Sequence, residues 1–224
     1  MKIMIINPNS DTQTTEAMQK TANSFSNGDF EVVCKSTPGG PKFIGTYEDQ
    51  IKAAPGMVNI VRENEKEFDA FIIACHADPN LDVIKEITKK PVVGIGEASM
   101  KIASMLGHSF SVLAPVEHSI PNKEALARKY HLQDTLASVR APKALEGECS
   151  EEERHLEVAK IIVKEDNAEV IVLGCAGMTG LDKIIQDKIG VPVLDGVVCA
   201  LIIATGLVRY KVSTSKVRRY NPVF

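Results

Sequence analysis

The stretch FDAFIIACHADPNLDVIKEITKKPVVGIGEASMKIA, residues 68–103, decides the fold class. A short, almost wholly apolar run, FIIAC, precedes a segment with helical spacing, and the same order then repeats from VVGIG onward. Apolar strands without polar alternation are typical of parallel sheets that are covered on both faces. Because alternating strands and helices build such sheets, the stretch predicts an α/β fold with parallel strands.

The same alternation extends along the rest of the chain and predicts eight strands. They fall into two sets of four, which indicates two four-stranded parallel sheets, each in a three-layer α/β/α half. The predicted strands are Lys2–Ile6, Glu31–Lys35, Ala70–Ala74, Val92–Ile95, Phe110–Ala114, Ala137–Arg140, Val170–Gly174 and Val191–Leu194.

Residues 168–204, AEVIVLGCAGMTGLDKIIQDKIGVPVLDGVVCALIIA, repeat the plan of residues 68–103, with Cys175 in the place of Cys75. This weak internal similarity predicts two pseudo-symmetric halves. We place the first at 1–106, joined by the C-terminal segment 206–224, and the second at 107–205. Ligands of open α/β sheets bind beyond the carboxyl ends of the strands, so we expect the active site in a cleft between the halves.

Two helices are also predicted from apolar residues at three- and four-residue spacing, at Ile51–Glu67 and Glu151–Asp166. The second has a start signal, because Ser150 as N-cap and Glu153 three residues later form a capping box.

The composition excludes several classes of protein. A net charge of −3 and the absence of a basic run argue against nucleic-acid binding. No apolar stretch is long enough to predict a membrane span. The start, MKIMIINPNSDTQ, lacks the features of a signal peptide, so we expect a cytoplasmic protein whose partner is a small molecule.

The chain has five cysteines, an odd number with no CxxC pair, which favours free thiols over a disulfide framework. Cys34 and Cys199 lie in apolar runs and are predicted core residues. Cys149, in GECSEEE, is interpreted as an exposed bystander.

Cys75 and Cys175 each end an apolar strand, at the turn into the next helix, where free backbone N–H groups favour an anion. A disulfide between them is possible but disfavoured by a cytosolic compartment. Zinc is disfavoured because no second Cys/His cluster has ligand spacing. Proton chemistry remains, in which one thiolate removes a proton from an acidified carbon and a second thiol returns one to the opposite face.

Several segments in the right order resemble the hydantoin/allantoin racemases of the aspartate/glutamate racemase superfamily. They are INPNS at 6–10, AAPG at 53–56, DAFIIAC at 69–75, PVVGIGEA at 91–98, IVLGCAGM at 171–178 and VPVLDGV at 191–197. The resemblance implies two α/β halves with a site between them, and cofactor-independent racemisation by Cys75 and Cys175. It also implies a homo-oligomer.

The chain departs from the family pattern beside the expected site. His76 stands where the family commonly has an aromatic residue, and Ala114 and Pro115 stand where it commonly has paired threonines. These positions are expected to contact the ring or the side chain of the substrate.

Four further residues are candidates for substrate binding. Asn7 and Ser10 follow the first strand and would donate to a ring carbonyl, or else cap the next helix. Ala176 and Gly177 follow the second cysteine, where their N–H groups would hold a carbonyl oxygen whose charge grows as an enolate forms.

The sequence therefore predicts cofactor-independent racemisation of 5-substituted hydantoins, with no metal. Allantoin is an alternative substrate. A decarboxylase or a cis–trans isomerase on a small carbonyl acid is an alternative within the superfamily. A small-molecule binding protein and a thiol redox sensor are the alternatives outside racemase chemistry.

Overall fold

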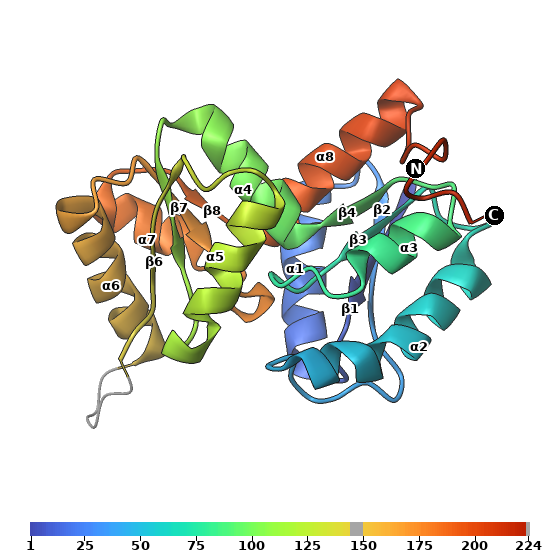
Figure 1. Cartoon of the computed structure of the whole chain (residues 1–224), viewed down its shortest axis with the longest axis horizontal. Coiled ribbons are helices and arrows are strands. Elements are labelled where there is room, and N and C mark those ends of the chain that lie inside the picture. The colour runs from blue at the N-terminus through green and yellow to red at the C-terminus, as the bar shows by residue number, and fades with distance from the viewer. Residues whose placement is uncertain (144–149, 223–224) are drawn as a thin grey trace. The chain divides into compact units, whose positions relative to one another are not determined.

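A computed structural model of the chain describes residues 1–143 and 150–222. Its first unit comprises residues Met1–Ile95 and Ala200–Phe224, of which the last two are outside that description. All four strands of this unit run parallel in the order β2-β1-β3-β4 (Figure 1). The strands are β1 (Lys2–Asn7), β2 (Glu31–Ser36), β3 (Ala70–Ile73) and β4 (Val92–Gly94).

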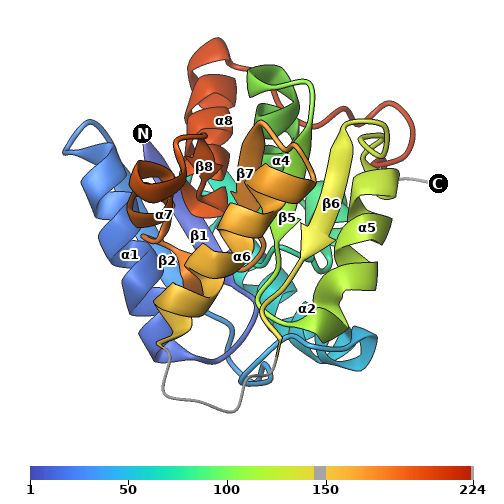
Figure 2. The same cartoon turned by 90° about the vertical axis from the view of Figure 1, so that its left-hand side faces the viewer.

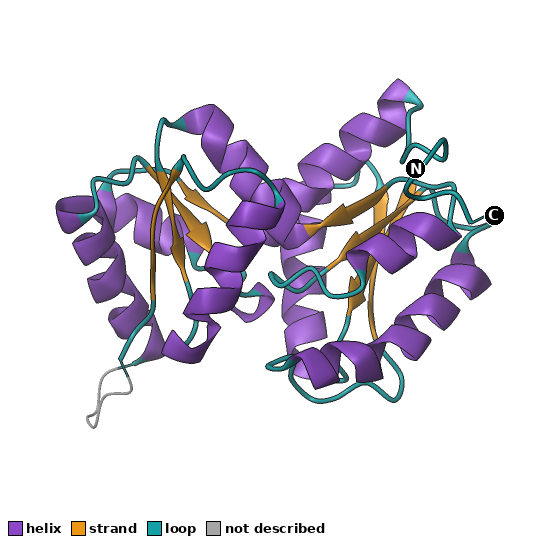
Figure 3. Cartoon of the chain, viewed as in Figure 1, coloured by secondary structure: helices purple, strands orange, loops and turns teal. Residues whose placement is uncertain are grey.

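Helices cover both faces of this sheet. Against one face lie α2 (Tyr47–Asn64) and α3 (Leu81–Ile87), whose apolar residues share a core with Phe71 and Ile73. The opposite face carries α1 (Thr12–Ser26), as Figure 3 shows with helices and strands in separate colours. Every residue of β3 is buried, because helices cover both faces of this sheet.

The second unit comprises residues Gly96–Cys199 and contains another parallel sheet, in the order β6-β5-β7-β8. Its strands are β5 (Phe110–Leu113), β6 (Leu136–Arg140), β7 (Val170–Leu173) and β8 (Val193–Leu194). Its helices are most of α4 (Ile95–Leu106), η1 (Glu117–Ser119), α5 (Ile120–Lys129), α6 (Glu151–Glu165), η2 (Ala176–Met178), α7 (Asp182–Ile189) and the start of α8 (Gly196–Tyr210).

Alternate residues of β5 and β7 fill two separate cores, as the two-residue period of a strand requires. Phe110 and Val112 pack with α4 and α5, whereas Leu113 and Leu173 pack with α6 and α7. Figure 2 shows α6 and α7 on the near face of this sheet. Two four-stranded parallel sheets with helices on both sides confirm the predicted fold class.

The local predictions differ from the structure by a few residues at the element ends. The capping box of Ser150 and Glu153 is confirmed at the start of α6. The helix predicted from Ile51 instead begins at Tyr47, because Thr46 and Asp49 form a second capping box upstream.

The structure divides the chain at Ile95 and Cys199, earlier than the boundaries at 106 and 205 placed from the sequence. The reason is side-chain packing, since Met100 and Ala103 of α4 are buried in one core with Phe110. A helix that directly follows a strand of the first sheet therefore contributes most of its length to the second unit. The C-terminal segment belongs to the first unit, where Tyr220 Oη donates to Asp82 at 2.7 Å.

Among the described residues, no helix has both the length and the apolar character needed to cross a membrane.

Candidate active site

Cys75 and Cys175 occupy equivalent positions in the two sheets. Cys75 lies two residues past the end of β3, and Cys175 lies two residues past the end of β7. Each strand is the third in its sheet order, and both thiols are half-buried. The repeat seen in the sequence is therefore a repeat of the fold, with a cysteine at the carboxyl end of the same strand in each unit.

The turn after Cys175 directs a backbone donor at its sulfur atom. Cys175 is the N-cap of η2, and the Gly177 N–H donates to Sγ at 3.3 Å. Ala176 is buried beside it. The sequence predicts a substrate carbonyl as the partner of the Gly177 N–H. In this structure that N–H donates to the thiol, so a substrate carbonyl would compete with the sulfur atom for it.

A buried carboxylate ties the Cys175 loop to the neighbouring strand. Asp195, directly after β8, accepts from Thr179 Oγ1 at 2.5 Å, from Gly180 N at 3.1 Å and from Val197 N at 2.7 Å. Burial raises the pKa of Asp195, although these hydrogen bonds act in the opposite direction. The contacts agree with the turn-fixing role that its position after a strand indicates.

The first unit also has a buried aspartate at the corresponding place, but there the loop after the cysteine supplies it and not the end of the neighbouring strand. Asp78 belongs to the loop after Cys75, with its N–H donating to the Cys75 carbonyl at 2.8 Å, and it is only 3% exposed. It packs against Gly94 at the end of β4 so closely that a Cβ on Gly94 would lie 2.3 Å from Asp78 Oδ1.

The two arrangements are related by strand register. Ile73 pairs with Gly94 in the first sheet, and Val172 pairs with Leu194 in the second, which puts Asp195 level with Leu173. Gly94 and Asp195 are thus equivalent positions. In one unit the loop carries the acid and the strand end is a glycine, whereas in the other the strand end carries the acid. In each unit a buried aspartate thus lies between the cysteine turn and the end of the neighbouring strand.

Asn7 is the last residue of β1 and Ser10 lies in the loop that follows, and both are engaged within the first unit. The Asn7 side chain is buried and donates to Thr15 Oγ1 at 3.0 Å and to the Asp11 carbonyl at 3.3 Å. The Ser10 N–H donates to the Pro41 carbonyl at 2.9 Å, and the N-cap of α1 is Asp11. A substrate contact by Asn7 stays a prediction, and it would compete with the bonds to α1.

The other predicted contact residues lie beside the strand ends. His76 follows Cys75 and is 1% exposed. Ala114 follows β5 and is buried, with its N–H donating to the Arg140 carbonyl at 2.7 Å. Pro115 lines a cavity within the second unit.

The remaining thiols differ from the candidate pair. Burial raises the pKa of Cys34 and of Cys199 to about 12. None of the four cysteines in the described ranges is in a disulfide. Cys149 lies outside the described residues.

We expect alkylation to separate these thiols. At pH 8 a thiol of pKa about 12 is ionised to roughly one part in 10⁴, so Cys34 and Cys199 should stay unmodified by iodoacetamide. Cys75 and Cys175 should be modified, as peptide mass spectrometry would show. The racemase activity of the protein should fall in step with their modification. Modification of Cys34 or Cys199 in the folded protein at a comparable rate would contradict this ranking.

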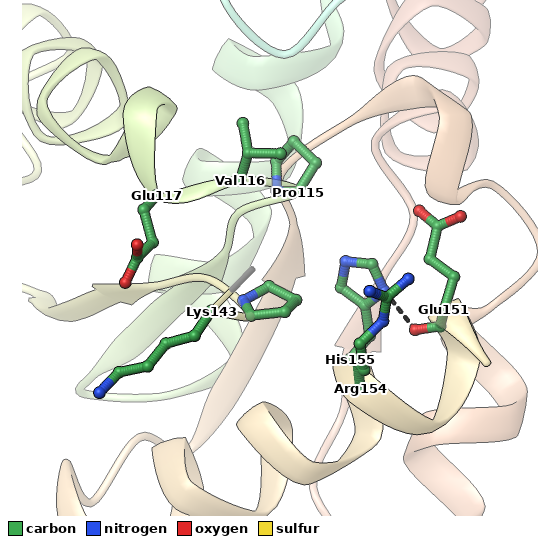
Figure 4. A pocket seen from close by; sticks show the side chains of 8 residues that line it. Pro115, Val116, Glu117, Lys143, Glu151, Arg154 and His155 are labelled. Carbon is green, nitrogen blue, oxygen red and sulfur yellow. Dashed lines mark hydrogen bonds between the residues drawn. The ribbon is translucent and has the colours of Figure 1, made fainter. Parts of the chain in front are cut away.

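The cavity in the second unit has a volume of about 460 Å³ (Figure 4). Pro115 to Glu117 come from the loop after β5, Pro142 and Lys143 follow β6, and Glu151, Arg154 and His155 come from the start of α6. Lys143, Arg154 and His155 are not among the site residues predicted from the sequence. The capping box marks the start of α6, and a helix that follows a parallel strand begins near the edge of the sheet where ligands bind, but this signal does not single out these side chains.

Within the described residues, no three His, Cys, Asp or Glu side chains are grouped so that they could hold a metal ion.

The comparisons with known proteins show the family of this chain. The family model for Asp/Glu/hydantoin racemase matches residues 3–204. The chain belongs to the Asp/Glu/hydantoin racemase family. It is therefore an isomerase of the racemase type, and the predicted family and enzyme class are confirmed.

Individual relatives of this racemase resemble it over almost their whole length. A hydantoin racemase from Pseudomonas sp. (strain NS671) is 37% identical, covering 99% of this chain and 91% of the relative. The solved allantoin racemase from Pseudomonas fluorescens has a TM-score of 0.91 at 33% identity, and the match covers 98% of this chain and 96% of the solved chain. The allantoin racemase from Klebsiella pneumoniae has a TM-score of 0.92 at 29% identity, covering 98% and 92%.

Proposed function

We propose that this racemase inverts 5-substituted hydantoins at C5, without a cofactor, and that Cys75 and Cys175 are its two bases. One observation carries the proposal: the two thiols occupy the same position in two repeats of one fold, each with a buried aspartate between its turn and the neighbouring strand. The similarity to hydantoin racemases and allantoin racemases supports a ureide substrate.

The chemistry needs both thiols. C5 of a hydantoin lies next to a ring carbonyl, so removal of its proton gives an enolate. The thiolate of one cysteine takes the proton from one face, and the C–H electron pair moves into the carbonyl. The thiol of the other cysteine then gives its proton to the opposite face of C5, which inverts the centre. The two cysteines have exchanged protonation states and are ready for the reverse reaction.

The neighbouring groups would hold the ring during this exchange. Backbone N–H groups of the two turns, at Ala176 and Gly177 among them, can stabilise the enolate oxygen. Asn7 and Ser10 would donate to the second ring carbonyl. His76, Ala114 and Pro115 would then contact the ring or its substituent.

The wild-type enzyme should racemise single enantiomers of several 5-substituted hydantoins in D2O, with deuterium entering C5 as optical rotation falls. Allantoin, which is itself a hydantoin, belongs in this panel because two of the similar solved structures are allantoin racemases. If rotation and C5 protons stay at the solvent background for every member, the proposal is wrong and a binding protein is the better interpretation. Inversion without deuterium incorporation would exclude proton exchange at C5.

A further inference from the structure

Two buried side-chain atoms at the cavity of the second unit are unpartnered. Over the part of the chain that the structure describes, Arg154 Nε and His155 Nε2 have no hydrogen-bond partner. His155 is only 1% exposed, and both residues line the cavity. Buried polar atoms are nearly always hydrogen-bonded, so two unpaired ones on residues that line a cavity point to a ligand as their partner.

The roles of these two atoms follow from their bonding. His155 Nδ1 lies 2.8 Å from the Glu151 carbonyl oxygen, as the dashed line in Figure 4 marks. A carbonyl oxygen only accepts, so Nδ1 carries a proton, and the ring tautomer that keeps this bond has Nε2 as an acceptor. Arg154 Nε carries a proton and is a donor. The cavity therefore offers one donor and one acceptor from neighbouring residues of α6.

The hydrogen-bonding pattern of the two unpaired atoms favours a neutral ligand. Among the described residues that line the cavity, two acidic side chains, Glu117 and Glu151, stand beside two basic ones, Lys143 and Arg154. A neutral group with a carbonyl oxygen beside an N–H satisfies both unpaired atoms, which a carboxylate does not. Amides and ureas have this pattern.

Strand register places the cavity at the same edge of the sheet as Cys175. Leu113 pairs with Leu173 and with Arg140, so Pro115, Cys175 and Pro142 each lie two residues past one row of paired residues. The start of α6 packs toward the same turn, because Leu156 shares a core with Met178 of η2. The cavity thus opens at the edge of the sheet that carries the thiol.

The distance between the cavity and the thiol suits the length of a substituent on C5. Two strand spacings of about 4.8 Å put the end of β6 roughly 10 Å from the end of β7. A thiol within about 3.5 Å of C5, a ureido group about 4 Å long and a hydrogen bond of about 3 Å span a similar distance.

We propose that this cavity holds the C5 substituent of the substrate and selects a neutral amide or ureido group. Arg154 Nε donates to the carbonyl oxygen of that group, and His155 Nε2 accepts from its N–H. This inference rests on the proposed function, because it assigns the substituent pocket of the same active site.

Two substitutions of His155 separate the proposed contact from a structural role. His155→Asn keeps a donor for the Glu151 carbonyl but has no atom at the Nε2 position. His155→Gln puts an amide at that position and serves as the matched variant. The substrates are allantoin, with its ureido group, and 5-isobutylhydantoin, which has a similar shape without hydrogen-bonding atoms.

We expect His155→Asn to lower kcat/KM for allantoin by about 10- to 100-fold, since one buried partner is lost. The value for 5-isobutylhydantoin should change less than about threefold, and His155→Gln should restore part of the allantoin rate. Equal losses on both substrates would overturn the proposal. So would a wild-type preference for 5-carboxymethylhydantoin over its neutral 5-carbamoylmethyl analogue.

A binding measurement tests the pocket apart from catalysis. In the Cys75→Ala/Cys175→Ala protein, methylurea should shift the ¹⁵N resonance of His155 Nε2, and acetate should not. A shift with acetate alone, or with neither probe, overturns the pocket assignment. If the wild-type enzyme racemises no hydantoin while methylurea still binds, the proposed function has failed and the ligand site stands.

Discussion

Cys75→Ala and Cys175→Ala should each lower the rate of hydantoin racemisation by at least about 10³-fold, because in the proposed reaction each removes the base on one face of C5. The loss should appear in kcat, since neither change removes a ring-binding group. Optical rotation with single enantiomers measures it. Serine at either position should not restore the rate, because an alcohol is a far weaker acid than a thiol.

The isotope pattern distinguishes two bases from one. A variant with a single thiol can still remove the proton from the enantiomer whose C5–H faces that thiol, and it then returns deuterium to the same face. We therefore expect each alanine variant to exchange one enantiomer without inverting it, and the two variants to choose opposite enantiomers.

Cys34→Ala is the matched control for the active-site variants. It removes a thiol from the same unit as Cys75, but one whose pKa burial raises to about 12, so racemisation should be retained. Racemisation by either active-site variant near the wild-type rate would show that the two-thiol assignment is wrong.

Gly94→Ala should destabilise the protein by about 3 kcal/mol, in the range of overpacked cores. The new Cβ would lie 2.3 Å from Asp78 Oδ1 and 2.4 Å from its Cγ, and Asp78 is buried with a φ of 46°. Asp78 cannot move without disturbing the Cys75 turn, because its own backbone N–H donates to the Cys75 carbonyl. We therefore expect kcat/KM to fall by at least about tenfold as well, since catalysis needs the thiol in place.

Gly206→Ala provides the comparison for Gly94→Ala. Gly206 lies inside α8 and has no atom within 4 Å of a built Cβ, so alanine should stabilise the protein by about 1 kcal/mol. Urea unfolding measures both changes. In an Asp78→Ala background the cost of Gly94→Ala should shrink, because the clashing carboxylate is gone. An unchanged cost there would exclude Asp78 as the cause.

The candidate site was only partly predictable from the sequence. Cys75 and Cys175 were found because a strand end followed by a helix start is a local pattern, and this pattern occurs twice. Asp78 and Gly94 are adjacent through strand pairing, which no local pattern reports. Asn7 shows the same limit, since its position predicts a substrate donor while the structure gives its amide protons partners in and before α1.

The cavity residues illustrate a second limit of prediction from the sequence. Arg154 and His155 begin an ordinary charged helix, and nothing in EEERHLEVAK marks them as functional. Their unpaired atoms become visible only when α6 packs on the sheet and buries His155 beside the ends of β5 and β6.

The sequence by itself determined the parallel α/β class, the internal repeat and the two cysteines, because apolar runs, helix start signals and spacing depend on neighbours in the chain. Tertiary structure alone decided where each unit ends, which aspartate lies beside each cysteine turn, and which residues line the cavity. These features depend on contacts between residues far apart in sequence, such as Thr179 with Asp195, and on the core that Met100 shares with Val170. Packing forms those contacts only after the sheets have assembled.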